Sequence, residues 1–272
     1  MQIHMKTILT TLSALLVILL TACSQKTQTE AVAEQSPGHK KQTFKIDSIV
    51  VSDSLKVSDS VTASFKMSTL LFPALSDKTL LDSIYHGQNL KAAIYTKNDL
   101  QQAIDEQKKM YFQENKESLA DYTPGFAQTW TQNSSMDIFS HADDMLTLIY
   151  KRDGYTGGAH GYYDETYRVF DLKKNRQISL SDVIKNQDAQ VWARILMTHF
   201  LQDDSDRGQA QMLLVKDIPL NNNFYFDRQN LYFLYNQYEI AAYAAGPVLI
   251  KIPFTEIKPF LQTDFKNRIN LQ

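Results

Sequence analysis

The side chain whose type best suits chemistry is His160, near the end of the glycine-rich segment Tyr155-Thr156-Gly157-Gly158-Ala159-His160-Gly161. An imidazole titrates near neutral pH and can act as a general base. A hydrolase would also need a nucleophile and an orienting carboxylate, and none stands beside His160 in a recognisable motif. We therefore expect no enzymatic activity, and a hydrolase with an unrecognised site around His160 is kept as an alternative.

Other chemical motifs are missing from the sequence. It contains no G-x-S-x-G, H-E-x-x-H, P-loop, G-x-G-x-x-G or C-x-x-C pattern, the usual signatures of serine hydrolases, zinc proteases, nucleotide sites and redox dithiols. His141, Asp143 and Asp144 form a lone H-x-D-D group, which we interpret as a solvated turn. His199 falls near an expected helix end, where the helix dipole gives it a structural role. We expect no metal and no cofactor.

Two unusual segments are the candidate binding surfaces. Three of the nine glycines fall within residues 157–161, which indicates backbone at positive φ or a close backbone approach. This segment is either a special strand connection or an exposed recognition loop. Residues 237–247 interleave aromatics with alanines and end in Gly-Pro, which is typical of a packed turn before a strand. The candidate binding residues are Tyr155, Gly157, Gly158, His160, Gly161, Tyr238, Glu239 and Tyr243.

The only cysteine indicates a lipid anchor. Lys6 precedes an apolar run that is too short for a comfortable membrane span and suits a signal peptide over residues 1–22. The run closes with Leu20-Thr21-Ala22-Cys23, which resembles the bacterial lipobox, so we expect Cys23 to be acylated, with chains such as palmitate. Ser24 favours sorting to the outer membrane. We expect a lipoprotein of the cell envelope that faces the periplasm or the exterior.

Composition limits the remaining possibilities. The chain has 272 residues, with 28 Lys+Arg against 30 Asp+Glu and a formal charge of −2. This balance argues against a nucleic-acid-binding protein, which needs a basic surplus. One cysteine excludes an internal disulfide framework and a structural zinc site made from several thiolates.

The pattern of elements predicts an α+β fold with largely antiparallel sheets and a few helices. A polar tether over residues 23–43 leads to two small modules, an N-terminal one over 44–154 and a C-terminal one over 155–272. In the first strand, Phe44, Ile46, Ser48 and Val50 alternate with polar neighbours. Period-two runs and apolar runs predict strands over 44–50, 61–67, 126–139, 145–150, 162–172, 224–226, 231–235 and 248–252. Apolar stripes and caps predict helices over 77–85, 100–119 and 181–201.

Three motifs together resemble the extracytoplasmic region of RsiV-type anti-sigma factors, which sense lysozyme. They are Y-T-G-G-A-H-G at 155–161, the D-L…I-S-L-S-D element at 171–182, and Y-E-I-A-x-Y-A-x-G-P at 238–247. The resemblance covers about residues 44–262 and is clearest from Tyr155 onward. It departs at Ala242, where that family commonly has proline. Similar domains, of formally unknown function, also occur in bacterial lipoproteins and beside peptidoglycan deacetylase domains.

The resemblance implies a binding function, and it extends only to the extracytoplasmic part of the family's architecture. A cleaved signal and an anchor replace the sigma-binding segment and the transmembrane helix, so we expect no sigma-factor partner. The deacetylase catalytic domain is also missing from the sequence. What the resemblance implies is a lipid-anchored envelope protein that binds or inhibits a lysozyme-like muramidase. A non-catalytic module that associates with peptidoglycan is the alternative partner hypothesis.

Overall fold

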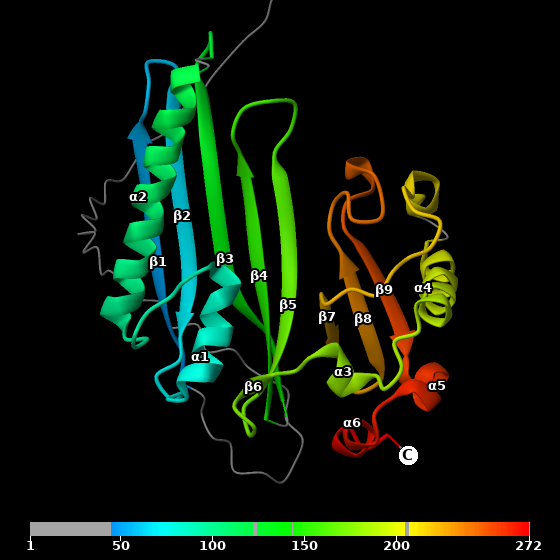
Figure 1. Ribbon diagram of the computed structural model, residues 1–272. Coiled ribbons are helices and arrows are strands. Elements are labelled where there is room, and N and C mark those ends of the chain that lie inside the picture. Colours follow the sequence, from blue (N-terminus) through cyan, green and yellow to red (C-terminus); the bar gives the residue numbers. More distant parts are fainter. Residues whose placement is uncertain (1–44, 122–123, 143, 205–206, 272) are drawn as a thin grey trace, which may run out of the picture. The chain divides into compact units, whose positions relative to one another are not determined.

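The computed structural model describes residues 45–121, 124–142, 144–204 and 207–271. The predicted signal peptide, the lipidation site Cys23 and the tether lie outside these residues and stay predictions. Among the helices within the described ranges, none is both long and apolar enough to span a membrane. The described part has the predicted α+β fold, with one larger and one smaller sheet (Figure 1).

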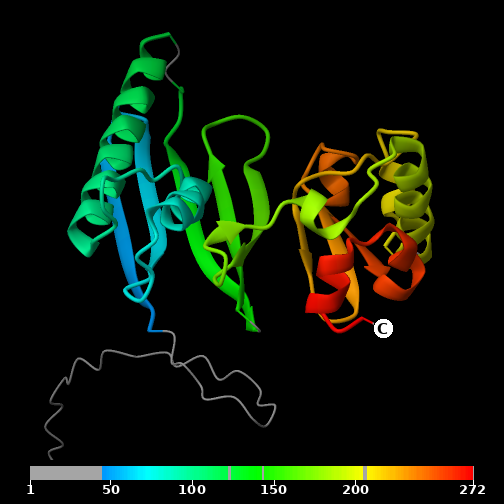
Figure 2. The ribbon, with the colours of Figure 1, turned by 60° about the horizontal axis from the view of Figure 1, so that its bottom comes forward.

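The larger sheet has six strands in the order β1-β2-β3-β4-β5-β6. Only β2 and β3 pair in parallel, and all other neighbours are antiparallel. A parallel pair needs a crossover connection, and the chain supplies it through two helices that cover one face of the sheet (Figure 1, Figure 2). The bounds are β1 Asp47–Lys56, β2 Val61–Leu71, α1 Lys78–Tyr85, α2 Lys97–Asp121, β3 Gln128–Ala142, β4 Met145–Tyr155, β5 Tyr162–Asp171 and β6 Arg176–Gln177.

The core of this sheet lies beneath the two helices. Alternate residues of β2 are buried, including Phe65 and Met67, and they pack with Leu80 and Ile84 of α1 and with Leu100 of α2. Burying each such side chain contributes about 1.5–3 kcal/mol. This packing fixes α1 against the sheet and therefore determines which side chains face β5.

The smaller sheet has three antiparallel strands in the order β7-β8-β9. Its core surrounds Trp192 of α4, which has no exposed surface and donates its indole N–H to the Asn186 carbonyl oxygen over 2.7 Å. The bounds are α3 Leu180–Val183, α4 Ala189–Asp203, β7 Phe224–Phe226, β8 Asn230–Tyr235, β9 Val248–Pro253, α5 Phe254–Ile257 and α6 Thr263–Arg268, with short 3-10 turns at His86–Gln88, Gln209–Met212, Tyr243–Ala245 and Lys258–Phe260.

The helix predicted over 181–201 is two helices. The chain leaves α3 at Ile184, which forms an antiparallel bridge with Leu261. It enters α4 after Asp188, whose carboxylate accepts from the N–H groups of Gln190 and Val191. A capping aspartate inside the apolar stripe marks this break.

The larger sheet does not end at the module boundary predicted between residues 154 and 155. That boundary falls inside β4, before its last residue, and the sheet continues through β5 and β6 to Gln177. Among the described residues, no strand of the smaller sheet pairs with β5. The β5 backbone instead hydrogen-bonds to two side-chain amides from the segments that flank β7 and β8. The Asn223 amide bonds to the Tyr167 N–H and the Glu165 carbonyl, and the Asn236 amide bonds to the N–H and carbonyl of Glu165.

Candidate functional site

The glycine-rich segment connects β4 to β5 and has the backbone conformation that its glycines predict. Gly157 and Gly158 have φ of 86° and 109°, a region that side chains other than glycine rarely adopt. A Cβ on Gly161 would lie 2.5 Å from the Gly154 carbonyl oxygen, so two backbone segments approach closely there. The Tyr155 hydroxyl donates to the Gly158 carbonyl oxygen over 3.0 Å and ties the loop to the end of β4.

The second unusual segment connects β8 to β9 at the same end of the molecule as the first (Figure 1). Its turn closes through a hydrogen bond from the Tyr238 N–H to the Ala241 carbonyl, over 3.1 Å. Tyr238 has φ of 65°, and an aromatic residue with positive φ stores backbone strain that the surrounding turn must hold. The Glu239 carboxylate accepts from the Asn236 N–H over 3.0 Å and braces the turn.

The structure brings these two segments together in an aromatic cluster of His160, Tyr238 and Tyr243, here called the His160 cluster. The His160 and Tyr243 rings stack with centroids 4.0 Å apart and an interplanar angle of 26°. The Tyr238 ring lies 6.3 Å from His160 and 5.9 Å from Tyr243. His160 is exposed, and Tyr238 is 57% exposed.

Hydrogen bonds define the state of the imidazole. His160 Nδ1 lies 2.8 Å from the Gly161 carbonyl oxygen, and because a carbonyl only accepts, Nδ1 carries the proton. In the neutral ring Nε2 is then an acceptor, and it faces the Tyr238 hydroxyl at 3.4 Å. The ring is oriented by a carbonyl and a phenol, so the cluster offers stacking faces and one weakly engaged nitrogen to a partner.

The remaining predicted site residues divide between the loop and a neighbouring groove. Tyr155, Gly157, Gly158 and Gly161 shape the loop that carries His160. Glu239 instead lines a groove of about 670 Å³. Within the described ranges no group of three or more His, Cys, Asp or Glu side chains could hold a metal ion.

That groove was not predicted, and it lies between α1 and β5. Every lining side chain is polar or charged: Asp82, Ser83, His86, Thr166, Arg168, Gln177, Asn221, Asn222, Asn223 and Glu239. Hydrogen bonds from Lys78 and then Tyr95 hold the pKa of the Asp82 carboxyl below its ordinary value. The run of three asparagines at 221–223 is the signal in the sequence that could have identified one wall.

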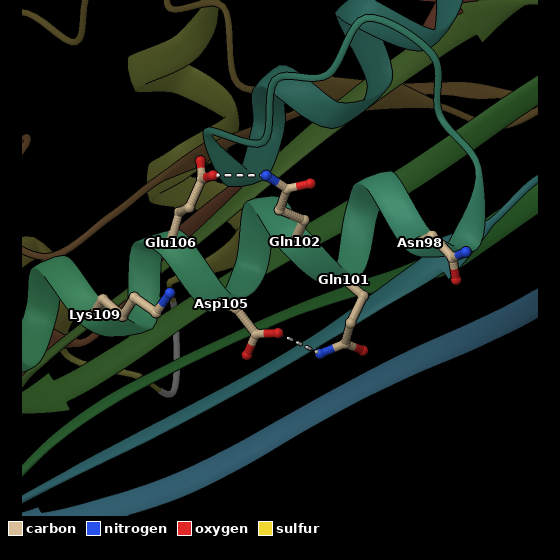
Figure 3. A pocket seen from close by; sticks show the side chains of 6 residues that line it. All are labelled: Asn98, Gln101, Gln102, Asp105, Glu106 and Lys109. Carbon is tan, nitrogen blue, oxygen red and sulfur yellow. Dashed lines mark hydrogen bonds between the residues drawn. The ribbon is translucent and has the colours of Figure 1, made fainter.

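A second depression, of about 380 Å³, lies on the outer face of α2 (Figure 3). Its side chains hydrogen-bond along the helix, from Gln101 to Asp105 and from Gln102 to Glu106, each over 3.2 Å. Such pairs four residues apart are typical of a solvated helix face, and we assign it no site.

Comparison with known proteins identifies a family domain and a shared fold. Residues 169–255 match the family described as "Protein of unknown function (DUF3298)". Two solved structures are similar: a DUF3298 family member from Bacteroides fragilis (21% identity, TM-score 0.66, 85% of this chain and 98% of that chain) and a DUF3298 family protein from Pseudomonas aeruginosa (16%, 0.56, 82% and 97%). No curated protein matches the chain. At these identities the likeness to the solved structures shows the fold alone. The match to a DUF3298 domain is consistent with the RsiV-like resemblance, without reaching that specific family.

Proposed function

We propose that this chain is a lipid-anchored binding protein of the cell envelope, and that the His160 cluster recognises a lysozyme-like muramidase without catalysis. One observation carries the proposal: two loop segments, 78 residues apart between His160 and Tyr238, meet in a single exposed aromatic surface. The identity of the partner rests on the resemblance of these same segments to lysozyme-sensing domains.

The composition of the cluster suits recognition of a protein. Tyrosine provides a large contact area and loses little rotamer freedom on binding, which is why it is enriched at the centres of interfaces. The stacked rings of His160 and Tyr243 and the braced turn at Tyr238 order the surface before the partner arrives. An ordered surface reduces the entropy lost on association.

A muramidase cleft is chemically complementary to this cluster. Glycosidases of this kind hold two carboxyl groups across the scissile bond. The weakly engaged Nε2 of His160 could take a hydrogen bond from a protonated carboxyl or, once protonated, donate to a carboxylate. The slightly negative chain also suits a basic partner, although such long-range charge mainly raises the association rate.

The envelope location is a proposal that rests on Cys23 and Ser24. Several buried acyl chains give stable anchoring, since each buried CH₂ contributes about 0.8 kcal/mol. A Cys23→Ala variant should be released from the membrane fraction. If that variant stays membrane-bound and fully processed, the anchor is wrong.

The partner is tested with the full chain in detergent, titrated with c-type lysozyme by calorimetry. A His160→Ala/Tyr243→Ala variant should lose about 2 kcal/mol, or roughly thirtyfold in affinity. Phe126→Ala is the matched control, because Phe126 is an aromatic residue that is 69% exposed and outside the cluster.

The same preparation separates the alternatives. No lysozyme binding at about 50 µM, with clear sedimentation on isolated peptidoglycan, would overturn the proposal in favour of a peptidoglycan-associated module. Turnover of a glycan or peptide substrate that disappears in His160→Ala would instead support a hydrolase.

A further inference from the structure

We infer that the polar groove between α1 and β5 binds a saccharide that carries a carboxylate, with Arg168 as its carboxylate anchor. This inference concerns different residues from the His160 cluster and does not depend on recognition of a muramidase. It follows from the way Arg168 is held and from the uniform chemistry of the groove wall.

Arg168 is fixed from one side and open on the other. Its Nη1 donates to the Ser83 carbonyl oxygen over 3.3 Å and lies 3.3 Å from His86 Nδ1. Its guanidinium carbon lies 5.5 Å from the centroid of the Tyr150 ring. These contacts leave Nε and Nη2 without a hydrogen-bond acceptor among the described residues. Nε and Nη2 form a planar pair of donors whose spacing matches the two oxygens of a carboxylate.

The charge around Arg168 also favours an anion. Among the residues that the structure describes, no carboxylate forms an ion pair with Arg168. Asp82, which lines the same groove, is already engaged by Lys78 Nζ at 2.6 Å and by the Tyr95 hydroxyl at 2.6 Å. The Glu239 carboxylate accepts from the Asn236 N–H. Arg168 therefore brings to the groove a cation that no carboxylate of the described residues pairs with, and an incoming carboxylate would pair with it.

The remaining wall matches the hydroxyl and acetamido groups of a sugar. Amides and hydroxyls of Thr166, Gln177 and Asn222 line it, and no aliphatic or aromatic side chain does. Amide side chains both donate and accept, as sugar hydroxyls do. A purely apolar ligand would bury these groups without partners, at about 1–3 kcal/mol for each.

The size of the groove also suits a saccharide. The volume of about 670 Å³ is large enough for more than one sugar residue.

The test measures binding of small sugars to the full chain in detergent, by calorimetry and saturation-transfer NMR. The probes are N-acetylmuramic acid and glucuronic acid, with N-acetylglucosamine as the uncharged comparison. We expect at least one acidic sugar to bind with Kd near about 1 mM. Arg168→Gln should weaken it about tenfold or more, since a charge-assisted bidentate pair is lost.

Two further variants keep the result interpretable. Arg194→Gln is the matched control, because Arg194 is exposed on α4 and outside the groove. Asn222→Asp changes an exposed side chain almost without changing its shape. It should weaken acidic sugars by repulsion and leave N-acetylglucosamine unchanged, even if Arg168→Gln folds poorly.

Several outcomes overturn the inference. They are no acidic sugar bound at about 20 mM, equal binding of N-acetylglucosamine, or an unchanged Kd in Asn222→Asp. Tighter binding of the dipeptide Ala-Ala than of either acidic sugar would assign the groove to peptide carboxylates instead. Preference for N-acetylmuramic acid over glucuronic acid, or the reverse, identifies the source of the carboxylate.

Discussion

A buried ion pair joins the C-terminal helix α6 to the end of β5, and breaking it should destabilise the fold strongly. The Asp171 side chain is 1% exposed and Arg268 is 26% exposed. Arg268 donates to both carboxylate oxygens of Asp171, and the backbone N–H groups of Lys173 and Lys174 donate to Oδ1 over 3.1 and 2.9 Å. Arg268→Gln would leave this carboxylate buried without its cation.

The expected loss follows from these contacts. Removing one partner of a buried ion pair costs about 3–5 kcal/mol. The two backbone N–H groups still bond to Asp171, and Arg268 is partly solvated, so the lower part of that range applies. We expect Arg268→Gln to lower the free energy of unfolding by about 3 kcal/mol, which shifts the urea midpoint by roughly 1 M or more.

The dependence on pH gives the prediction a second signature. Burial alone raises the pKa of the Asp171 carboxyl, but the hydrogen bonds from Arg268 and then from the Lys174 N–H outweigh it, and the pKa lies below 3.8. A depressed pKa stabilises the fold above the unfolded pKa of about 3.9, and this contribution disappears as the pH falls through the folded pKa. Arg268→Gln lacks the part of this contribution that Arg268 supplies, at every pH. The difference in free energy of unfolding between the wild-type chain and Arg268→Gln should therefore reach its full size above about pH 5 and decrease toward pH 3.

The assay is urea unfolding of the full chain, followed by the fluorescence of the buried Trp130 and Trp192, at about pH 7 and pH 3. Arg152→Gln is the control, because its pair with Asp164 lies near the surface, with side chains 51% and 26% exposed, and should contribute about 1 kcal/mol or less. Asp171→Asn combined with Arg268→Gln should recover part of the loss, since no buried charge remains. Equal losses in Arg268→Gln and the control, or an unchanged difference at pH 3, would refute the reasoning.

Two local features give further expectations. Gly161→Ala places a Cβ 2.5 Å from the Gly154 carbonyl oxygen, so it should lower stability by about 1–3 kcal/mol in thermal unfolding. Gly125→Ala, with nothing within 4 Å, should be close to neutral. Asp188→Ala removes the N-cap of α4 and should cost about 1 kcal/mol in urea unfolding. A change below about 0.3 kcal/mol would show that water replaces the cap.

Much of the fold could be predicted from local patterns in the sequence, and the errors of that prediction have local causes. The strands predicted over 224–226 and 231–235 are two aromatic runs that flank a polar turn, and they pair as the hairpin of β7 and β8. The Asp227 carboxylate accepts from the N–H groups of Gln229 and Asn230 in that turn. In β1 the buried residues are Ile49 and Val51, and Val50 is 59% exposed. Three adjacent apolar residues leave the phase of alternation undetermined. The alternation predicted through Ile46, Ser48 and Val50 therefore had the wrong phase in β1.

The candidate site could be predicted only in part, because its pieces are far apart in the chain. The glycine run and the aromatic turn were each unusual in sequence. Their meeting through His160 and Tyr243 depends on how β5 contacts the smaller sheet, and no local period encodes that. The groove escaped prediction because Ser83 and Arg168, 85 residues apart, are ordinary polar residues until α1 packs beside β5.

The amides that hold β5 fix both candidate surfaces. The side chains of Asn236 and Asn223 both donate to the Glu165 carbonyl oxygen, over 3.0 and 2.8 Å. Asn236 begins the turn that carries Tyr238, whereas Asn223 lines the groove. Each amide therefore positions one surface against the same strand, and their substitutions should have separable effects.

We expect Asn236→Ala to weaken binding of a muramidase at the His160 cluster, while the Kd of an acidic sugar stays within about twofold. Asn223→Ala should do the reverse, because its loss moves the groove wall and frees the Tyr167 N–H. Each substitution leaves β5 backbone groups without a partner and should lower stability by about 1–3 kcal/mol. Titration of both variants with lysozyme and with an acidic sugar tests whether the two effects are separable. If each variant weakens both ligands equally, the two surfaces move as one unit, and β5 does not position them independently.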